Sequence, residues 1–203
     1  MTPPSRTLGI AFADGDRTSR IAGAVVRDDG TLDGLGFGAC TVGGTDATDA
    51  VIALFDRLGR ADVRHVAVAG IAPAWFNLLD LSRLHDAVER PVYAVSYEES
   101  AGLEPALREA FDGEVLARRL TGYRSLPSRV RVGLEESRSA AGTDSEPTAS
   151  EAGGPLFVRA VGLDADEAAA AVRGLVREGF RRPEPLRIAA IAASAHRAAT
   201  ARA

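Results

Sequence analysis

The sequence contains no lysine, one cysteine (Cys40) and no long apolar run. A single cysteine excludes an internal disulfide framework and any cysteine-based zinc cluster. No apolar stretch approaches the roughly 18 residues of a membrane-spanning helix, and the first residues lack the apolar core of a secretory signal. We therefore expect a cytoplasmic protein without a membrane partner.

All 24 basic residues are arginine, and 28 acidic residues give a formal net charge of −4. This balance provides no global basic field that would attract nucleic acid. Arginine binds phosphate and carboxylate groups through paired hydrogen bonds, although a GC-rich coding bias explains the same composition without any function. The length of 203 residues and the hydrophobic content of 46% suit one domain, expected over residues 1–203.

Residues 63–100 predict a buried strand–helix–strand unit around which the chain is organised. The uninterrupted apolar run Val66–Ala69 is typical of a central parallel strand that is buried on both faces. Leucines at helical spacing predict a helix over Trp75–Glu89, and a further strand is expected over Pro91–Tyr97. Such a unit needs more strands beside it to complete a sheet.

Three strand-like runs separated by turn signals come before this unit, which predicts an antiparallel meander. A helix that ends at Gly59 then leads into the unit. The order β-β-β-α-β-α-β predicts an α/β fold with a ribonuclease H-like mixed sheet, followed by extra C-terminal helices and a strand. A generic mixed sheet is the alternative. Residues 135–154 are rich in small and polar residues without an apolar anchor and predict a disordered or variable loop.

Carboxylates near one edge of this sheet are candidates for a metal site. Asp14 follows the first strand, Asp46 begins a helix, and Asp80 lies one turn after Asn77 on the next predicted helix. Carboxylate oxygens are the ligands that Mg²⁺ or Mn²⁺ prefers, and two such ions can clamp a phosphodiester. The ordinary alternatives are a turn acid, a helix cap and a solvated helix face.

Three stretches of the sequence resemble one protein family. They are GGTDATDAV (43–51), VAGIAPAWFNLLDL (68–81) with RPVYAVS (90–96), and RPEPLRIAAIAA (182–193). They are similar to the endonuclease dU family, mainly archaeal relatives of endonuclease V that were long uncharacterised. The resemblance spans nearly the whole chain, and the family is placed among ribonuclease H-like folds. It implies metal-dependent cleavage of DNA near a damaged base, deoxyuridine in particular.

The family's motifs can be matched residue by residue. Its D-G-x-D-A-T block falls on Gly43–Thr48, so that its last acid is Asp46. Its F-N-x-x-D block falls on Phe76–Asp80, and its P-E-P-L-R block falls on Pro183–Arg187. These matches imply a functional part for the acids and the asparagine within them.

Two acids of the family pattern are missing. The first acid of the D-G-x-D-A-T block is replaced by Gly43, and the G-I-D-D of the first strand reads Gly-Ile-Ala-Phe at residues 9–12. The loss of two acids from one site should cripple two-metal chemistry unless Asp14 or Asp16 substitutes. The departure leaves open whether this chain cuts DNA or only binds it.

The leading hypothesis is a divergent, endonuclease V-like DNA endonuclease that depends on Mg²⁺ or Mn²⁺ and acts near deaminated bases in DNA repair. We expect Asp46 and Asp80 to bind the metal, with Asp14 as a third catalytic acid. The alternative is a catalytically impaired family member that binds nucleic acid or an unknown protein partner, and an unrelated hydrolase is a third reading.

The resemblance and the helix dipole together suggest which residues contact the DNA. We expect Asn77 to orient a phosphate or a water molecule. Arg182 and Arg187 lie at the start of the last predicted helix, where backbone amides and guanidinium groups favour phosphate. DNA is accordingly the expected partner.

Overall fold

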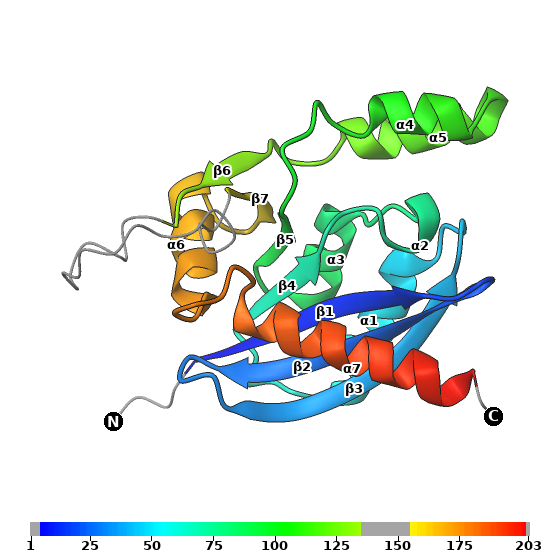
Figure 1. The fold of residues 1–203 in the computed structure, drawn as a ribbon. Coiled ribbons are helices and arrows are strands. Elements are labelled where there is room, and N and C mark those ends of the chain that lie inside the picture. The colour runs from blue at the N-terminus through cyan, green and yellow to red at the C-terminus, as the bar shows by residue number, and fades with distance from the viewer. Residues whose placement is uncertain (1–4, 135–154, 202–203) are drawn as a thin grey trace.

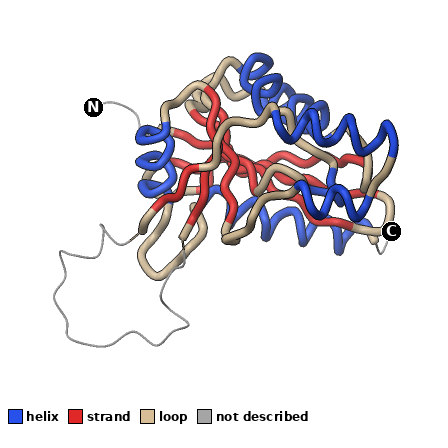
Figure 2. The backbone as a smooth tube through the Cα atoms, turned by 90° about the horizontal axis from the view of Figure 1, so that it is seen from above, coloured by secondary structure: helices blue, strands red, loops and turns tan. Residues whose placement is uncertain are grey.

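The computed structural model describes residues 5–134 and 155–201. A seven-stranded mixed sheet forms its centre, and helices pack on both faces of this sheet (Figures 1 and 2). The strands lie in the order β3-β2-β1-β4-β5-β7-β6. The loop predicted over residues 135–154 lies outside the described residues.

The first three strands form the predicted antiparallel meander. β1 (Arg6–Asp14) pairs with β2 (Thr18–Arg27), and β2 pairs with β3 (Leu32–Thr41). A tight turn closes the first hairpin, in which the Gly15 amide donates to the Thr18 carbonyl oxygen at 3.1 Å. β1 therefore has an antiparallel neighbour on one side and is free to pair with a later strand on the other.

The parallel half of the sheet follows. β4 (His65–Ala69) lies parallel to β1, and β5 (Val92–Ser96) lies parallel to β4. Helix α1 (Ala47–Leu58) connects β3 to β4, and α3 (Leu81–Val88) precedes β5. Three antiparallel strands followed by αβαβ is the order that the sequence predicts for a ribonuclease H-like sheet.

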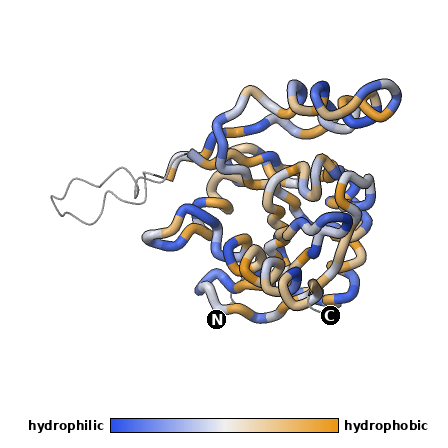
Figure 3. Tube along the Cα trace, turned by 45° about the vertical axis from the view of Figure 1, so that its right-hand side comes forward, coloured by the Kyte–Doolittle hydropathy of each residue, from blue (hydrophilic) through white to orange (hydrophobic). Residues whose placement is uncertain are grey.

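The remaining elements enlarge this core. Helices α4 (Glu104–Ala110) and α5 (Gly113–Arg124) form a hairpin that projects from the body of the molecule (Figures 1 and 3). β7 (Leu156–Val161) pairs antiparallel with β5, and the short β6 (Val130–Val132) pairs with β7 at the sheet edge. The α4–α5 hairpin thus lies between β5 and β6 in the sequence and outside the sheet in space.

Two helices complete the second face of the sheet. α6 (Ala165–Leu175) begins with a capping box in which Asp164 and Glu167 accept each other's backbone amides. α7 (Glu184–Thr200) packs on β1 and β2, while α1 and α3 cover the opposite face. Across both described stretches, no helix combines the length and the apolar character that crossing a membrane requires.

The single helix predicted over residues 75–89 is wrong. The structure has a short turn, α2 (Pro73–Phe76), then an extended segment, and then α3, which begins after Asp80. Three consecutive residues of this turn have left-handed backbone angles, with φ of 50°, 52° and 62° at residues 74–76. Asn77 and Asp80 therefore do not share a helix face, and the geometry that paired them in the prediction is absent.

Small side chains on β1 bring α7 unusually close to the sheet. Gly9 has no side chain on this face, and a Cβ built there would overlap the Pro185 backbone at the start of α7. One step along the same face, Ala11 packs with Ala189. Leu8 and Ile10 point to the opposite face and belong to the core beneath α1 and α3. The strand thus presents a large-residue face and a small-residue face, and α7 occupies the second.

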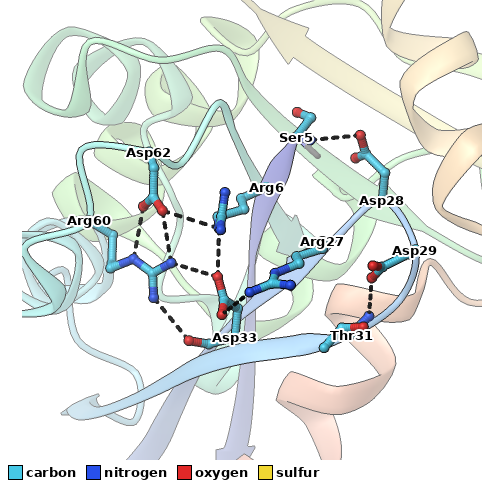
Figure 4. Close-up of polar contacts among 9 residues, drawn as sticks. All are labelled: Ser5, Arg6, Arg27, Asp28, Asp29, Thr31, Asp33, Arg60 and Asp62. Atoms are coloured by element: carbon cyan, nitrogen blue, oxygen red, sulfur yellow. Dashed lines mark hydrogen bonds and ion pairs between the residues drawn. The ribbon is translucent and has the colours of Figure 1, made fainter. Parts of the chain in front are cut away.

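A cluster of ion pairs lies at the amino end of β1 (Figure 4). Asp33 accepts hydrogen bonds from Arg6 at 2.6 Å, from Arg60 at 2.8 Å and from Arg27 at 3.0 Å. Arg60 also binds Asp62 at 2.8 Å. The guanidinium groups of Arg6, Arg60 and Arg27 hold the pKa of Asp33 well below its usual range. This cluster ties β1, β2 and β3 to the segment that leads into β4.

Candidate functional site

A cleft of about 540 Å³ opens at the carboxyl ends of the parallel strands. Ala11 and Phe12 of β1 and the residues that follow β4 and β5 line the side of the cleft that the sheet forms. Leu103 and Tyr123 line it from the α4–α5 hairpin. Open α/β sheets commonly bind ligands at this edge. We refer to this hollow as the cleft.

Three arginines line the cleft. Arg129 donates to the Ser100 carbonyl oxygen at 3.0 Å, and its guanidinium lies 4.1 Å from the centroid of the Phe157 ring. Arg159 donates to the Pro127 carbonyl oxygen, and burial lowers the pKa of its guanidinium. Guanidinium groups remain charged over the physiological pH range. The cleft therefore gathers three guanidinium charges that the net charge of the chain does not reveal.

The third arginine, Arg182, is exposed and free to bind a ligand. Its guanidinium lies 5.3 Å from the Tyr97 ring centroid, and within residues 5–134 and 155–201 it forms no hydrogen bond or ion pair. The Tyr97 hydroxyl also lacks a hydrogen-bond partner within the described part of the chain. Burial raises the pKa of Tyr97 to about 12, so its proton stays available for donation at neutral pH. The exposed guanidinium of Arg182 suits a phosphate ligand.

Asp14 is the one predicted catalytic acid that lines the cleft. Its Oδ1 accepts a 2.6 Å hydrogen bond from the hydroxyl of Ser19, which is fully buried on the neighbouring strand. Glu98, which follows β5, is a second carboxylate on the cleft wall. Asp14 at the end of β1 and Glu98 after β5 thus lie at one sheet edge.

Asp46 lies outside the cleft lining and is bound within the protein. It accepts hydrogen bonds from the Thr41 hydroxyl at 2.8 Å and from the Asn77 side-chain amide at 2.7 Å. Burial raises the pKa of Asp46, but the hydrogen bonds from Asn77 and Thr41 outweigh this effect, and the net shift is downward. Although Asp46 precedes α1, its side chain makes no cap hydrogen bond to that helix.

Asn77 caps α1 instead. Its Oδ1 accepts the Ala47 backbone amide at 3.0 Å, and its Nδ2 donates to the Thr41 carbonyl oxygen at 2.8 Å as well as to Asp46. The side chain is fully buried. This position differs from the predicted contact with a DNA phosphate, because all the polar atoms of the amide bind protein groups. Asn77 joins the end of β3, the start of α1 and the segment before α3.

Asp80 and Arg187 are also engaged locally. Asp80 is the N-cap of α3 and accepts the Arg83 backbone amide at 2.9 Å. Arg187 binds Glu184 through two hydrogen bonds of 2.7 and 2.8 Å, one turn away on α7. Neither lines the cleft, whereas Arg182, predicted together with Arg187, does.

The residues present do not fit a resident Mg²⁺ or Mn²⁺ site. Within the described residues, no group of three or more Asp, Glu, His or Cys side chains is placed to hold a metal ion. Asp14, Asp46 and Asp80 are not gathered into such a group, and each has its own local hydrogen-bond partner. Ala11 and Phe12, where the resemblance predicted first-strand acids, contribute apolar surface to the cleft.

Sequence reasoning missed Arg119, which locks the turn formed by residues 73–76. Its guanidinium donates to the carbonyl oxygens of Phe76 and Gly43, each at 2.8 Å, and lies 4.3 Å from the Phe111 ring centroid. Burial lowers the pKa of this guanidinium. No local pattern in the helix sequence distinguishes Arg119 from its exposed neighbour Arg118, because its partners come from distant segments.

The chain is similar in sequence and in structure to known proteins. The family described as Endonuclease dU matches residues 4–197. A "UPF0215 protein" of Pyrobaculum calidifontis is 29% identical over 188 residues, covering 92% of this chain and 93% of the relative. A solved protein of unknown function from Archaeoglobus fulgidus superposes with a TM-score of 0.73 at 24% identity, covering 95% of this chain and 98% of that chain.

Endonuclease V is a more distant structural relative. The Ciona intestinalis enzyme, solved with a 24mer DNA that contains inosine, superposes with a TM-score of 0.59 at 13% identity. The superposition covers 98% of this chain and 88% of that enzyme. The fold of this chain is therefore ribonuclease H-like, as the order of its elements predicted.

Proposed function

This chain belongs to the endonuclease dU family, and from that premise we propose that its cleft binds the sugar–phosphate backbone of a nucleic-acid strand. The observation that carries the proposal is the presence of Arg129, Arg159 and Arg182 in one cleft at the carboxyl edge of the parallel strands. Arginine is suited to phosphate because its planar fork donates two parallel hydrogen bonds. Arg182 supplies a guanidinium with free donors, and the other two supply fixed positive charge.

Salt dependence tests this proposal. Binding of a fluorescently labelled single-stranded oligonucleotide is measured by anisotropy at several salt concentrations. Each lost phosphate contact lowers the slope of log K against log salt by about 0.7 for a single strand. We expect Arg182→Ala to weaken binding and to reduce this slope.

The matched control is Arg64→Ala. Arg64 is exposed and lies before β4, at the opposite end of the parallel strands from the cleft. We expect this variant to bind like wild type. Equal losses in both variants would indicate diffuse surface charge, and salt-independent binding would contradict the phosphate contacts.

A second candidate function is DNA cleavage beside deoxyuridine, which membership in the family and the position of Asp14 in the cleft favour. It is tested by incubating uracil- or inosine-containing DNA with the protein, with and without Mg²⁺ or Mn²⁺. Nicking that Asp14→Asn abolishes would establish cleavage and the part of Asp14 in it. Asp46→Asn and Asp80→Asn test the two predicted metal ligands in the same assay.

Binding without nicking in any of these metal conditions would instead identify a family member that binds without cutting. The arrangement of the carboxylates agrees with this second outcome, because the described residues gather no metal-binding group. Thermal unfolding of each variant shows whether a loss of nicking results from the removed carboxylate or from a loss of the fold.

A further inference from the structure

We propose that Trp75 is a stacking platform for one unpaired base of the strand that the cleft binds. The inference rests on the proposed nucleic-acid binding and adds a base-binding position to it. Trp75 lies in the turn formed by residues 73–76, where the sequence predicted the start of a long helix.

The backbone of this turn is held in an unfavourable conformation. Ala74, Trp75 and Phe76 all have positive φ, between 50° and 62°. Residues with a Cβ seldom adopt this region, because the Cβ approaches the backbone carbonyl oxygen too closely. Such strain persists only where surrounding structure imposes it, and it is concentrated at functional sites.

The surrounding structure does impose it. The Ala74 carbonyl oxygen accepts the Gly43 amide at 2.7 Å, and the Phe76 carbonyl oxygen accepts Arg119 at 2.8 Å. Within the turn, the Asn77 amide donates to the Pro73 carbonyl oxygen at 2.9 Å. The conformation is therefore fixed by contacts with distant segments.

The indole of Trp75 is fixed on one side and open on the other. Its ring centroid lies 5.1 Å from that of Phe111 and 5.8 Å from that of Phe76. Gly43 permits a close approach, since a Cβ there would lie 2.9 Å from the indole carbon Cε3. Even so, the side chain of Trp75 is 54% exposed. The fold thus holds a large flat apolar surface rigidly in contact with solvent.

The position of the turn connects this surface to the cleft. Pro73 and Ala74, which directly precede Trp75, line the cleft together with Arg182. A strand whose phosphates contact the arginines has its bases free to reach the adjoining wall. Aromatic side chains stack on unpaired bases of any sequence, because each base presents a π-face. The three arginines in the adjoining cleft therefore favour a nucleic-acid base over an apolar peptide as the occupant of this surface.

The experiment uses Trp75 as its own reporter, because it is the single tryptophan of the chain. A short single-stranded oligonucleotide is titrated into the full-length protein, and both tryptophan fluorescence and anisotropy of a labelled end are followed. We expect the indole emission to be quenched as the oligonucleotide binds. Abasic substitution scanned along the oligonucleotide should reduce the quenching strongly at one position.

Three variants separate stacking from other effects. Trp75→Ala should lose about ten- to hundredfold in affinity, whereas Trp75→Phe, which keeps a flat ring, should retain most of it. Phe37→Ala is the matched control, because Phe37 is an aromatic residue 43% exposed on the edge strand β3. It should bind like wild type.

The outcomes distinguish this inference from the proposed function. If Trp75→Ala binds as tightly as wild type while Arg182→Ala is weakened, base stacking is overturned and the function of the cleft stands. Quenching that persists equally with every abasic oligonucleotide also overturns stacking. If no oligonucleotide binds the wild-type protein, the proposed function and this inference both fall.

Discussion

The side-chain amide of Asn77 donates a 2.7 Å hydrogen bond to the carboxylate of Asp46, 31 residues away in the sequence. Both residues lie in stretches that resemble the endonuclease dU family; Asp46 was expected to bind a metal, and Asn77 was expected to orient a phosphate or a water molecule. In the structure they bind each other, and through this pair the end of β3 is joined to the start of α1. Their contribution to stability can therefore be measured independently of any reaction.

Asn77→Ala should lower the free energy of unfolding by about 1–3 kcal/mol, because it leaves the buried backbone amide of Ala47 without its hydrogen-bond acceptor. Urea denaturation followed by circular dichroism measures this change. Thr45→Ala, at an exposed position in the same segment, should change stability by less than about 0.5 kcal/mol. Equal stability of Asn77→Ala and wild type would contradict the capping role of Asn77.

The Asp33 cluster should make the protein sensitive to acid. The pKa of Asp33 is depressed in the folded state, so the unfolded chain takes up a proton first as the pH falls. The stabilisation is complete above the ordinary Asp value of 3.8 and is lost as the pH falls below it towards the folded pKa. Asp33→Asn should therefore destabilise the protein at pH 7 and flatten the fall in stability below pH 3.8.

Thermal unfolding between pH 2 and 7 would measure this dependence on wild type and variant. Asp56→Asn serves as the control, because Asp56 is exposed and its carboxylate has no hydrogen bond or ion pair within the described segments. A parallel pH dependence in wild type and Asp33→Asn would exclude Asp33 as a source of the acid sensitivity.

Gly9→Ala should be strongly destabilising, because the added methyl group would overlap the Pro185 backbone. Overpacking of a rigid contact costs about 1–3 kcal/mol. Gly174→Ala is an informative comparison, because Gly174 lies within α6 and a Cβ there meets no atom within 4 Å. That variant should be stabilised by about 0.5–1 kcal/mol through helix propensity. Opposite signs for the two glycines would verify the close approach of α7 to β1.

Arg119→Lys should release the turn formed by residues 73–76. An ammonium group cannot donate to two separated carbonyl oxygens with the geometry of the guanidinium, although the charge is kept. We expect a loss of about 1–3 kcal/mol in stability and a red shift of the Trp75 emission as the indole becomes more hydrated. Arg118→Lys, at the exposed neighbouring position, should leave both readouts unchanged.

Much of the fold follows from local patterns in the sequence. The turn signals between the first strands, the uninterrupted apolar runs of β4 and β5, and the order of strands and helices were sufficient to predict the ribonuclease H-like sheet. These features are local because each depends on side-chain periodicity and turn residues within one segment.

The site was harder to predict from the sequence, because its geometry depends on contacts between residues that are far apart in the chain. Leucines at helical spacing predicted one helix through Asn77 and Asp80, but Gly43 and Arg119 impose the left-handed turn that breaks it. Arg159 joins the cleft because β7 pairs with β5, and Arg129 joins it because its guanidinium binds the Ser100 carbonyl oxygen in the segment after β5. Residue type and position in the sequence were sufficient to predict Asp14 and Arg182 as site residues. They could not show that Asp46 and Asp80 lie outside the cleft lining.

The packing of α7 on β1 and β2 has a consequence for biosynthesis. Every strand of the sheet precedes α7 in the chain, and until α7 has been made, Gly9, Ala11 and Ala22 lack the helix that covers their face. The nascent chain therefore presents an incomplete core on the ribosome while the rest is translated. A pause or a truncation before Glu184 would leave a sheet with one open apolar face, which is a surface that chaperones bind and that aggregates.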